Sequence, residues 1–192
     1  MASILKVTEI QHTGGTSAMT VSSTGQVIPK WYAIRALKHV AINWTTGGAS
    51  AGTAVTYDNT SVVGAFNSGF NVNNLATDGK FIMPVDGIYR VSFSFLVNNN
   101  NSSGGNTYVT IVKNNTVGSG GDNATTMFND YHAFAANTHT MAQGTTIVQC
   151  VANDYICICK EDSFNYWGNG TSTAAATWGY NQCCIELIGS SV

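Results

Sequence analysis

The sequence predicts an all-β protein, a sandwich of two antiparallel sheets, from three observations. Apolar and polar residues alternate along several short segments, most clearly in residues 88–97. A period of two places successive side chains on opposite faces of a strand. Asn, Thr, Ser and Gly dominate the polar positions and the intervening segments, which suits short strands and polar turns. No stretch has a convincing 3.6-residue period, so we expect about ten strands and no crossover helices.

Residues 79–97 contain the best-defined strand and turn of the chain. One face of the predicted strand carries Tyr89, Val91, Phe93, Phe95 and Val97. The preceding segment 84–87 ends in Asp86-Gly87, a pair typical of a tight reversal because glycine accepts a positive φ. We therefore expect a hairpin, with Phe81 and Met83 on the partner strand.

This block resembles the centre of the complement globular-head domain, the tumour-necrosis-factor-like jelly roll. The shared pattern is Gly-x-Phe-x-x-Pro-x-x-Gly-x-Tyr-x-x-Ser, followed by the alternating aromatic strand. Residues 108–115 resemble the family's central strand, 146–159 its paired strands around a turn at Asn153-Asp154, and 182–189 its closing strand. The resemblance covers about residues 33–189 and implies a jelly roll. In such folds three copies pack their inner sheets around an axis.

The chain also departs from this family in its loops. Asn stands where the family has Gly at both turns, and a long Asn-rich loop occupies residues 98–106. The function of the family's loops is therefore not carried over to this chain. Residues 31–44 are expected to form the first strand of the inner sheet. Residues 126–141 fit either a strand pair or one helical turn.

Size and charge limit the function classes. With 192 residues the chain can bury about 70% of its unfolded surface in one core. Only 9% of residues are charged, and the eight Lys and Arg residues are scattered, so we expect no nucleic-acid partner. The first ten residues lack the apolar core of a signal peptide, and no later apolar run is long enough to span a bilayer. We expect no membrane insertion.

Residues 1–30 differ from residues 31–192, which we assign to the jelly-roll head. Their apolar segments are interrupted by glycines and are too short to form a core of their own. The candidate docking residues are Ile4, Leu5, Val7, Ile10, Val21, Val27 and Ile28. This leader resembles the start of many virion structural proteins of tailed bacteriophages, where it is an attachment segment. The alternative is an extra pair of edge strands on the head.

The sequence lacks patterns for catalysis or metal binding. Five cysteines are an odd number, which favours reduced thiols. Cys157 and Cys159 would share one strand face, and Cys183 and Cys184 would lie on opposite faces. Neither spacing is a zinc knuckle, so we interpret them as small buried residues. The four His are dispersed and the carboxylates form no pair. We expect no metal, no cofactor and no enzymatic activity.

Aromatic residues are concentrated in the second half of the chain. By the resemblance, we assign Phe134, Trp178 and Tyr180 to contacts between the subunits of a trimer. Tyr166 and Trp167 are candidates for stacking against a host surface glycan. The alternative for all of them is filling of the core.

These features predict a homotrimeric virion structural protein, made in the host cytoplasm and displayed on the virion surface. It would be a capsid decoration, cement or head-fibre protein that docks on the major capsid protein or another virion protein. Trimerisation would multiply three weak contacts. The alternative function is a receptor-binding tail or fibre-tip protein that recognises a host surface glycan. A secreted complement-like ligand ranks third and an enzyme fourth.

Overall fold

The computed structural model describes the chain in segments that together contain fifteen strands. The described residues are 9–11, 17–21, 23–24, 27–29, 32–37, 52–55, 57, 66–73, 75–98, 105–115, 117–118, 126–135, 139–160, 165–166 and 181–189. All regular secondary structure within these segments is strand. The chain divides into two units, residues 1–31 and residues 32–192, which are described separately below.

The small unit is a three-stranded antiparallel sheet of order β1-β2-β3. Its strands are β1 (Glu9–Gln11), β2 (Ser17–Val21) and β3 (Val27–Pro29). Glu9 pairs with Thr20, and Val21 pairs with Val27. These strands are three to five residues long, as the short apolar segments between glycines require.

The large unit consists of two six-stranded sheets, each antiparallel throughout. We call the first the inner sheet. Its strands lie in the order β12 (His139–Cys150), β8 (Gly87–Asn98), β15 (Gln182–Gly189), β4 (Ala33–Leu37) and β6 (Phe66–Ser68). Its sixth strand, β14 (Asn165–Tyr166), also pairs with β8. We call the second the outer sheet. Its strands lie in the order β10 (Val117–Gly118), β5 (Gly52–Ala54), β13 (Tyr155–Lys160), β9 (Gly105–Lys113) and β11 (Thr126–Phe134). Its sixth strand, β7 (Phe81–Ile82), also pairs with β13.

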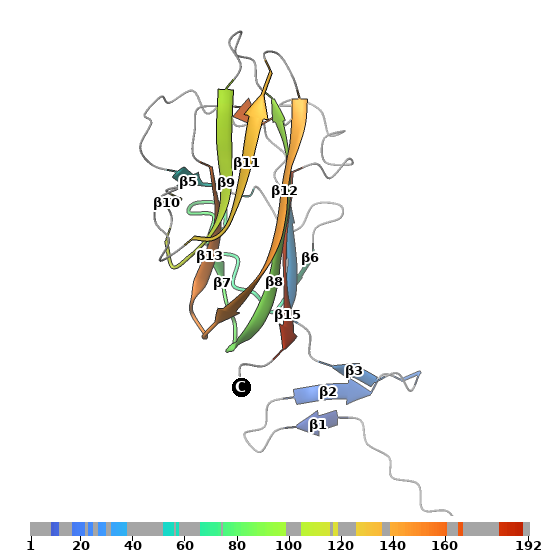
Figure 1. Ribbon diagram of the computed structural model, residues 1–192. Helices are drawn as coiled ribbons and strands as arrows, with labels where there is room; N and C mark the ends of the chain where they lie inside the picture. The colour runs from blue at the N-terminus through green and yellow to red at the C-terminus, as the bar shows by residue number, and fades with distance from the viewer. Residues whose placement is uncertain are drawn as a thin grey trace, which may run out of the picture. The chain divides into compact units, whose positions relative to one another are not determined.

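Figure 1 shows these sheets as two layers, with β9, β11 and β13 in one and β8, β12 and β15 in the other. The predicted two-sheet antiparallel sandwich is therefore confirmed. The predicted strand at 31–44 begins the inner sheet as β4, and its described part ends at Leu37. The predicted closing strand at 182–189 is confirmed with the same bounds.

The core lies between the two sheets and follows from the period-two alternation. Tyr89, Val91, Phe93 and Phe95 of β8 all point inward, each at most 3% exposed. They pack with the inward residues of the outer sheet, which are Val109, Ile111, Ile156 and Ile158. Aromatic contacts tie the layers together, including Phe93 with Phe128 of β11 at 6.3 Å between ring centroids. Burial of such side chains contributes about 1.5–3 kcal/mol each to folding.

The expected hairpin at 84–87 is wrong. β7 pairs with β13 in the outer sheet, whereas β8 pairs with β12 and β15 in the inner sheet, so this turn crosses from one sheet to the other. Gly87 is not in the positive-φ region. A Cβ there would lie 2.9 Å from the backbone oxygen of Gly189 and 2.3 Å from Leu187 Cδ1, so close packing favours glycine here.

The predicted pairing of strands around Asn153-Asp154 is also wrong. β12 belongs to the inner sheet and β13 to the outer sheet, so the turn between them again changes sheet. Asn153 has a φ of 71° and Asn114 a φ of 55°. Asn is among the few non-glycine residues that accept this conformation, so Asn153 can stand where the resembling family has Gly. Residues 126–141 supply β11 and the start of β12, which resolves their ambiguity in favour of strands.

Candidate subunit interface on the inner sheet

The outward face of the inner sheet is the surface through which three copies pack in the jelly rolls that the sequence resembles. On β8 this face carries Ile88, Arg90, Ser92, Ser94 and Leu96, because the alternate residues fill the core. Its centre is made of small side chains. Ser92 lies between Thr145 of β12 and Cys184 of β15, and Ser94 lies between Gln143 and Gln182. The serines and Cys184 are half-buried, and their small size leaves the sheet surface accessible to a closely packed partner.

The charged side chains on this face make one ion pair and one hydrogen bond within the sheet. Arg90 Nη1 lies 3.0 Å from Glu186 Oε1 across β8 and β15. Arg35 of β4 donates from Nε to Gln182 Oε1 at 2.7 Å. Both partners of the ion pair are partly exposed, so the contact stabilises the sheet only slightly. Its main effect is to neutralise the charges of Arg90 and Glu186, whereas the uncharged Gln182 amide does not neutralise Arg35.

Apolar side chains stand at the edges of the same face. Ile147 of β12 is 63% exposed and lies opposite Arg90. Ile188 of β15 is 40% exposed and occupies an irregularity in the β15–β8 register, between Leu187 and Gly189. Exposed isoleucines cost free energy in water, and a partner surface that covers them recovers it. The face therefore combines a small-residue centre with uncovered apolar groups.

The cysteines do not form a chemical site. All five are free thiols, and Cys150, Cys157, Cys159 and Cys183 are buried. Burial raises the pKa of Cys150 to about 11 and that of Cys157 to about 12. Burial likewise raises the pKa of Cys184, despite its position near Arg35. These shifts disfavour the thiolate and hence nucleophilic reactivity. Cys157 and Cys159 share one face and Cys183 and Cys184 do not, as predicted.

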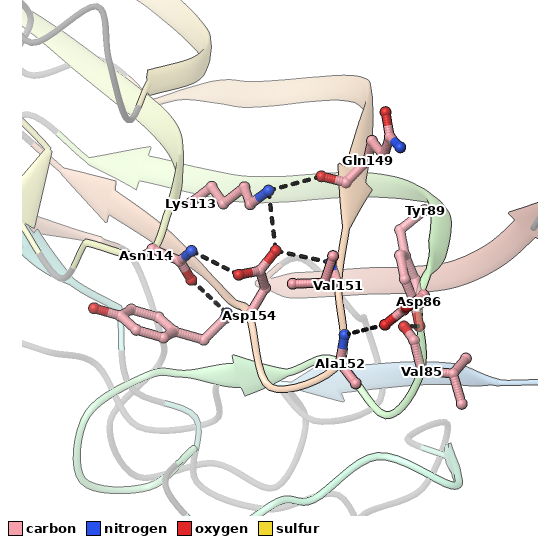
Figure 2. Close-up of polar contacts among 10 residues, drawn as sticks. Val85, Asp86, Tyr89, Lys113, Asn114, Gln149, Val151, Ala152 and Asp154 are labelled. Carbon is pink, nitrogen blue, oxygen red and sulfur yellow. Dashed lines mark hydrogen bonds and ion pairs between the residues drawn. The ribbon is translucent and has the colours of Figure 1, made fainter. Parts of the chain in front are cut away.

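A polar cluster joins three turns at one end of the sandwich, as Figure 2 shows. Asp154 Oδ1 accepts from Asn114 Nδ2 at 2.7 Å, and Asp154 Oδ2 accepts from Val151 N at 2.8 Å. Lys113 Nζ lies 3.0 Å from Asp154 Oδ2 and also donates to Gln149 O at 2.9 Å. The cluster therefore links the ends of β9, β12 and β13.

Two further contacts extend this cluster to the turn before β8. Ala152 N donates to Asp86 Oδ1 at 2.7 Å, and Tyr89 Oη donates to Val85 O at 2.7 Å. Burial raises the pKa of Tyr89 to about 12, which keeps its hydroxyl protonated as a donor. Each carboxylate is satisfied by donors within the protein, so we interpret the cluster as structural. The described residues contain no group of three or more His, Cys, Asp or Glu that could hold a metal ion. Nor does any helix within the described segments have the length and apolarity to cross a membrane.

The predicted site residues are only partly within the described segments. Phe134 lies at the end of β11 in the outer sheet, not in the inner sheet. Tyr166 lies in β14 and pairs with Val97. Trp167, Trp178 and Tyr180 lie outside the described residues, as do Ile4, Leu5 and Val7. Of the remaining docking candidates, Ile10 is in β1, Val21 in β2, and Val27 and Ile28 in β3, with Val21 half-buried. None of these positions tests the assigned roles.

Sequence reasoning named no residue on the outward face of the inner sheet as a contact residue. A signal was present, since the polar face of residues 88–97 contains two serines and one arginine. The strands on either side of this polar face are set by pairings between residues far apart in the chain, such as Ser92 with Cys184. Alternation alone does not reveal these pairings.

Comparisons with known proteins identify the fold. No family model matches the chain, and no curated protein is significantly similar in sequence. Solved structures are similar: the crystal structure of murine APRIL at pH 5.0 matches with a TM-score of 0.53 and 11% sequence identity. The match covers 83% of this chain and 100% of the other. The chain therefore has the two-sheet antiparallel jelly-roll fold of tumour-necrosis-factor-like proteins.

Proposed function

We propose that the chain is a homotrimeric structural protein of a virion surface, with the jelly roll as the displayed head and residues 1–31 as the attachment unit. The observation that carries the trimer is the outward face of the inner sheet. It has a small-residue centre at Ser92 and Ser94, paired charges, and uncovered Ile147 and Ile188. Folds of the tumour-necrosis-factor-like type typically form homotrimers.

Association is favoured because the face exposes apolar area that a second copy can cover and contains an ion pair that can be buried without leaving either charge unpaired. Covering Ile147 removes apolar area from water, and each square ångström contributes about 25 cal/mol. Because Arg90 and Glu186 already neutralise each other, a second copy that covers them buries no unpaired charge. Small residues at the centre permit the close approach that gives good shape complementarity.

The virion role rests on the leader. Its short strands form a separate unit, and its sequence resembles the attachment segment of tailed-phage virion proteins. In this function the small unit binds the shell or another virion protein, and three copies in one trimer bind more tightly than one because the later contacts are intramolecular. A receptor-binding tail or fibre tip is the second candidate, favoured by the contact between Tyr108 and the exposed Tyr131 on the outer sheet.

Native mass spectrometry at micromolar concentration tests the trimer. The wild-type chain is expected at three times the monomer mass of 20.3 kDa. Ser92→Arg places a bulky cation at the centre of the face and should yield monomers. Ile147→Asp should weaken the trimer without affecting the fold, because this side chain is 63% exposed. Asn129→Arg is the matched control, since Asn129 is exposed in the outer sheet and should leave the trimer intact.

A monomeric wild type would overturn the assembly. Equal trimer stability in wild type, Ser92→Arg and Ile147→Asp would move the interface elsewhere on the head. The virion role has its own test, which is immunogold labelling of particles with an antibody against the head. Labelling of the shell is expected, labelling of the tail alone would select the second candidate, and unlabelled particles would refute both. Deletion of residues 1–31 should abolish particle binding and leave the trimer intact.

A further inference from the structure

Two tyrosines form an aromatic pair on the outward face of the outer sheet, with Tyr131 exposed and Tyr108 half-buried. Tyr131 of β11 lies directly opposite Tyr108 of β9 in the antiparallel register. Their ring centroids are 4.9 Å apart and their planes are tilted by 49°. Tyr131 is 51% exposed although it is a large aromatic residue. β11 is the last strand of the outer sheet, so the pair stands at the edge of this surface.

The described neighbours of the pair on this face are uncharged. Asn129 lies two residues before Tyr131 on the same face of β11, opposite Thr110, and Ala133 lies two residues after Tyr131. Asn129 and Ala133 are exposed. The adjacent carboxylate belongs to Asp130, which lies on the other face of β11 and accepts from Gln143 N of β12 at 3.0 Å. The platform therefore presents aromatic rings, an amide and a methyl group.

We propose that Tyr108 and Tyr131 form a binding platform for an uncharged glycan. A sugar ring has a flat apolar C–H face that fits an aromatic ring, and hydroxyl groups at its edge that fit amide and phenol partners. Tyrosine supplies both an apolar ring and a polar end, and the Asn129 amide supplies two donors and an acceptor. The neutral surroundings complement a neutral ligand.

Other occupants fit this platform less well. A phosphate-bearing or acidic ligand needs Lys or Arg, and the described residues of β9 and β11 place none on this face. A stable protein partner needs about 1,000 Å² of buried surface, far more than two rings and their small neighbours offer. A cross-strand pair also stabilises a sheet by about 0.2–1 kcal/mol. This structural role does not require that half of Tyr131 remain exposed.

A printed array of oligosaccharides tests the proposal with the full-length chain. The array carries neutral hexose and N-acetylhexosamine chains beside sialylated and sulfated chains. Wild type is expected to bind at least one neutral chain. Tyr131→Ala should lower the apparent affinity for that chain by roughly tenfold or more. Tyr131→Phe keeps the ring and should stay within about threefold of wild type. Val151→Ala removes a similarly exposed apolar side chain from the turn between β12 and β13 and should bind as wild type does.

Three results would overturn the proposal. They are no binding of wild type to any neutral chain, binding confined to sialylated or sulfated chains, and undiminished binding by Tyr131→Ala. Native mass spectrometry of the same samples separates this test from that of the trimer. A Tyr131→Ala variant that is still trimeric but no longer binds the glycan would support the platform independently of the trimer. A monomeric wild type that still binds would refute the assembly and keep the platform.

Discussion

The two sheets of the jelly roll share one apolar core but have very different outward faces. On the outer sheet, Ala54, Val112, Cys157 and Cys159 form a second buried cluster, with Tyr155 packed against it. On the inner sheet, the corresponding surface carries serines, paired charges and exposed isoleucines. The outer-sheet face is therefore covered within the chain over β5, β13 and the Val112 end of β9, whereas its β11 edge is exposed. The inner-sheet face contains side chains suited to contact with a second copy.

This difference explains why alternation was clearer in some strands than in others. β8 has one buried face and one polar face, which produces the sharp pattern at 88–97. In β13, Ile156 to Cys159 are buried on both faces, and the sequence there reads as a continuous apolar run. Periodicity thus reports how many faces of a strand are covered.

Removal of a core isoleucine should have the largest effect and should be equal for the two sheets. Ile185 points inward from the inner sheet and Ile158 from the outer sheet, and both are fully buried. Each substitution by alanine should lower the free energy of unfolding by about 2–5 kcal/mol. Val151→Ala is the control, because Val151 is 56% exposed and should change stability by about 0.5 kcal/mol or less. Urea denaturation at one protein concentration measures all three. A loss confined to one sheet would argue against a shared core.

Substitutions on the outward faces test the comparison directly. Val112→Ala on the outer sheet should cost about 1.5–3 kcal/mol, because Val112 is fully buried in the second cluster. Thr145→Ala on the inner sheet should stay within about 0.5 kcal/mol, because Thr145 is exposed. The same denaturation experiment applies, with circular dichroism as the readout. Equal effects at the two positions would show that the outward faces do not differ in burial.

The sandwich and the inward residues of β8 could be predicted from local alternation, and the closing strand was predicted from the family resemblance. Sequence reasoning failed at the two turns that change sheet, 83–87 and 151–154. A turn residue such as Gly87 indicates a reversal but does not say whether the next strand pairs with the previous one. That choice depends on distant contacts such as Leu187 against Gly87.

The candidate surfaces were predicted less well than the fold for the same reason. Tyr108 and Tyr131 become neighbours only through the β9–β11 register, and their separation in sequence gives no sign of this pairing. The polar cluster at Asp154 likewise joins residues about forty positions apart, as the Asn114 contact shows. Sites assembled across strands are therefore visible only once the strand order is known.

Loss of the polar cluster should have a smaller effect than loss of a buried apolar side chain, and its contribution should depend on pH. Asp154 accepts from Asn114, Val151 and Lys113, and these donors replace part of the water that burial removes. Asp154→Ala should therefore cost about 1–2 kcal/mol at pH 7. Asp78→Ala is the matched control: Asp78 pairs with Lys80 at 3.3 Å on the surface, and its loss should cost about 0.5 kcal/mol or less.

The sign of the pH dependence follows from the pKa of Asp154. Burial alone would raise it, but the hydrogen bonds from Asn114, Val151 and Lys113 outweigh burial and lower it below the ordinary value of 3.8. The folded state therefore holds this proton less tightly than the unfolded state does. The stabilisation is complete above pH 3.8 and is lost as the pH falls through the lower folded value. Urea denaturation of wild type and Asp154→Ala should show a constant difference between pH 7 and pH 5 that shrinks below pH 3.8. A difference that persists unchanged in acid would mean that packing, and not the carboxylate, links the three turns.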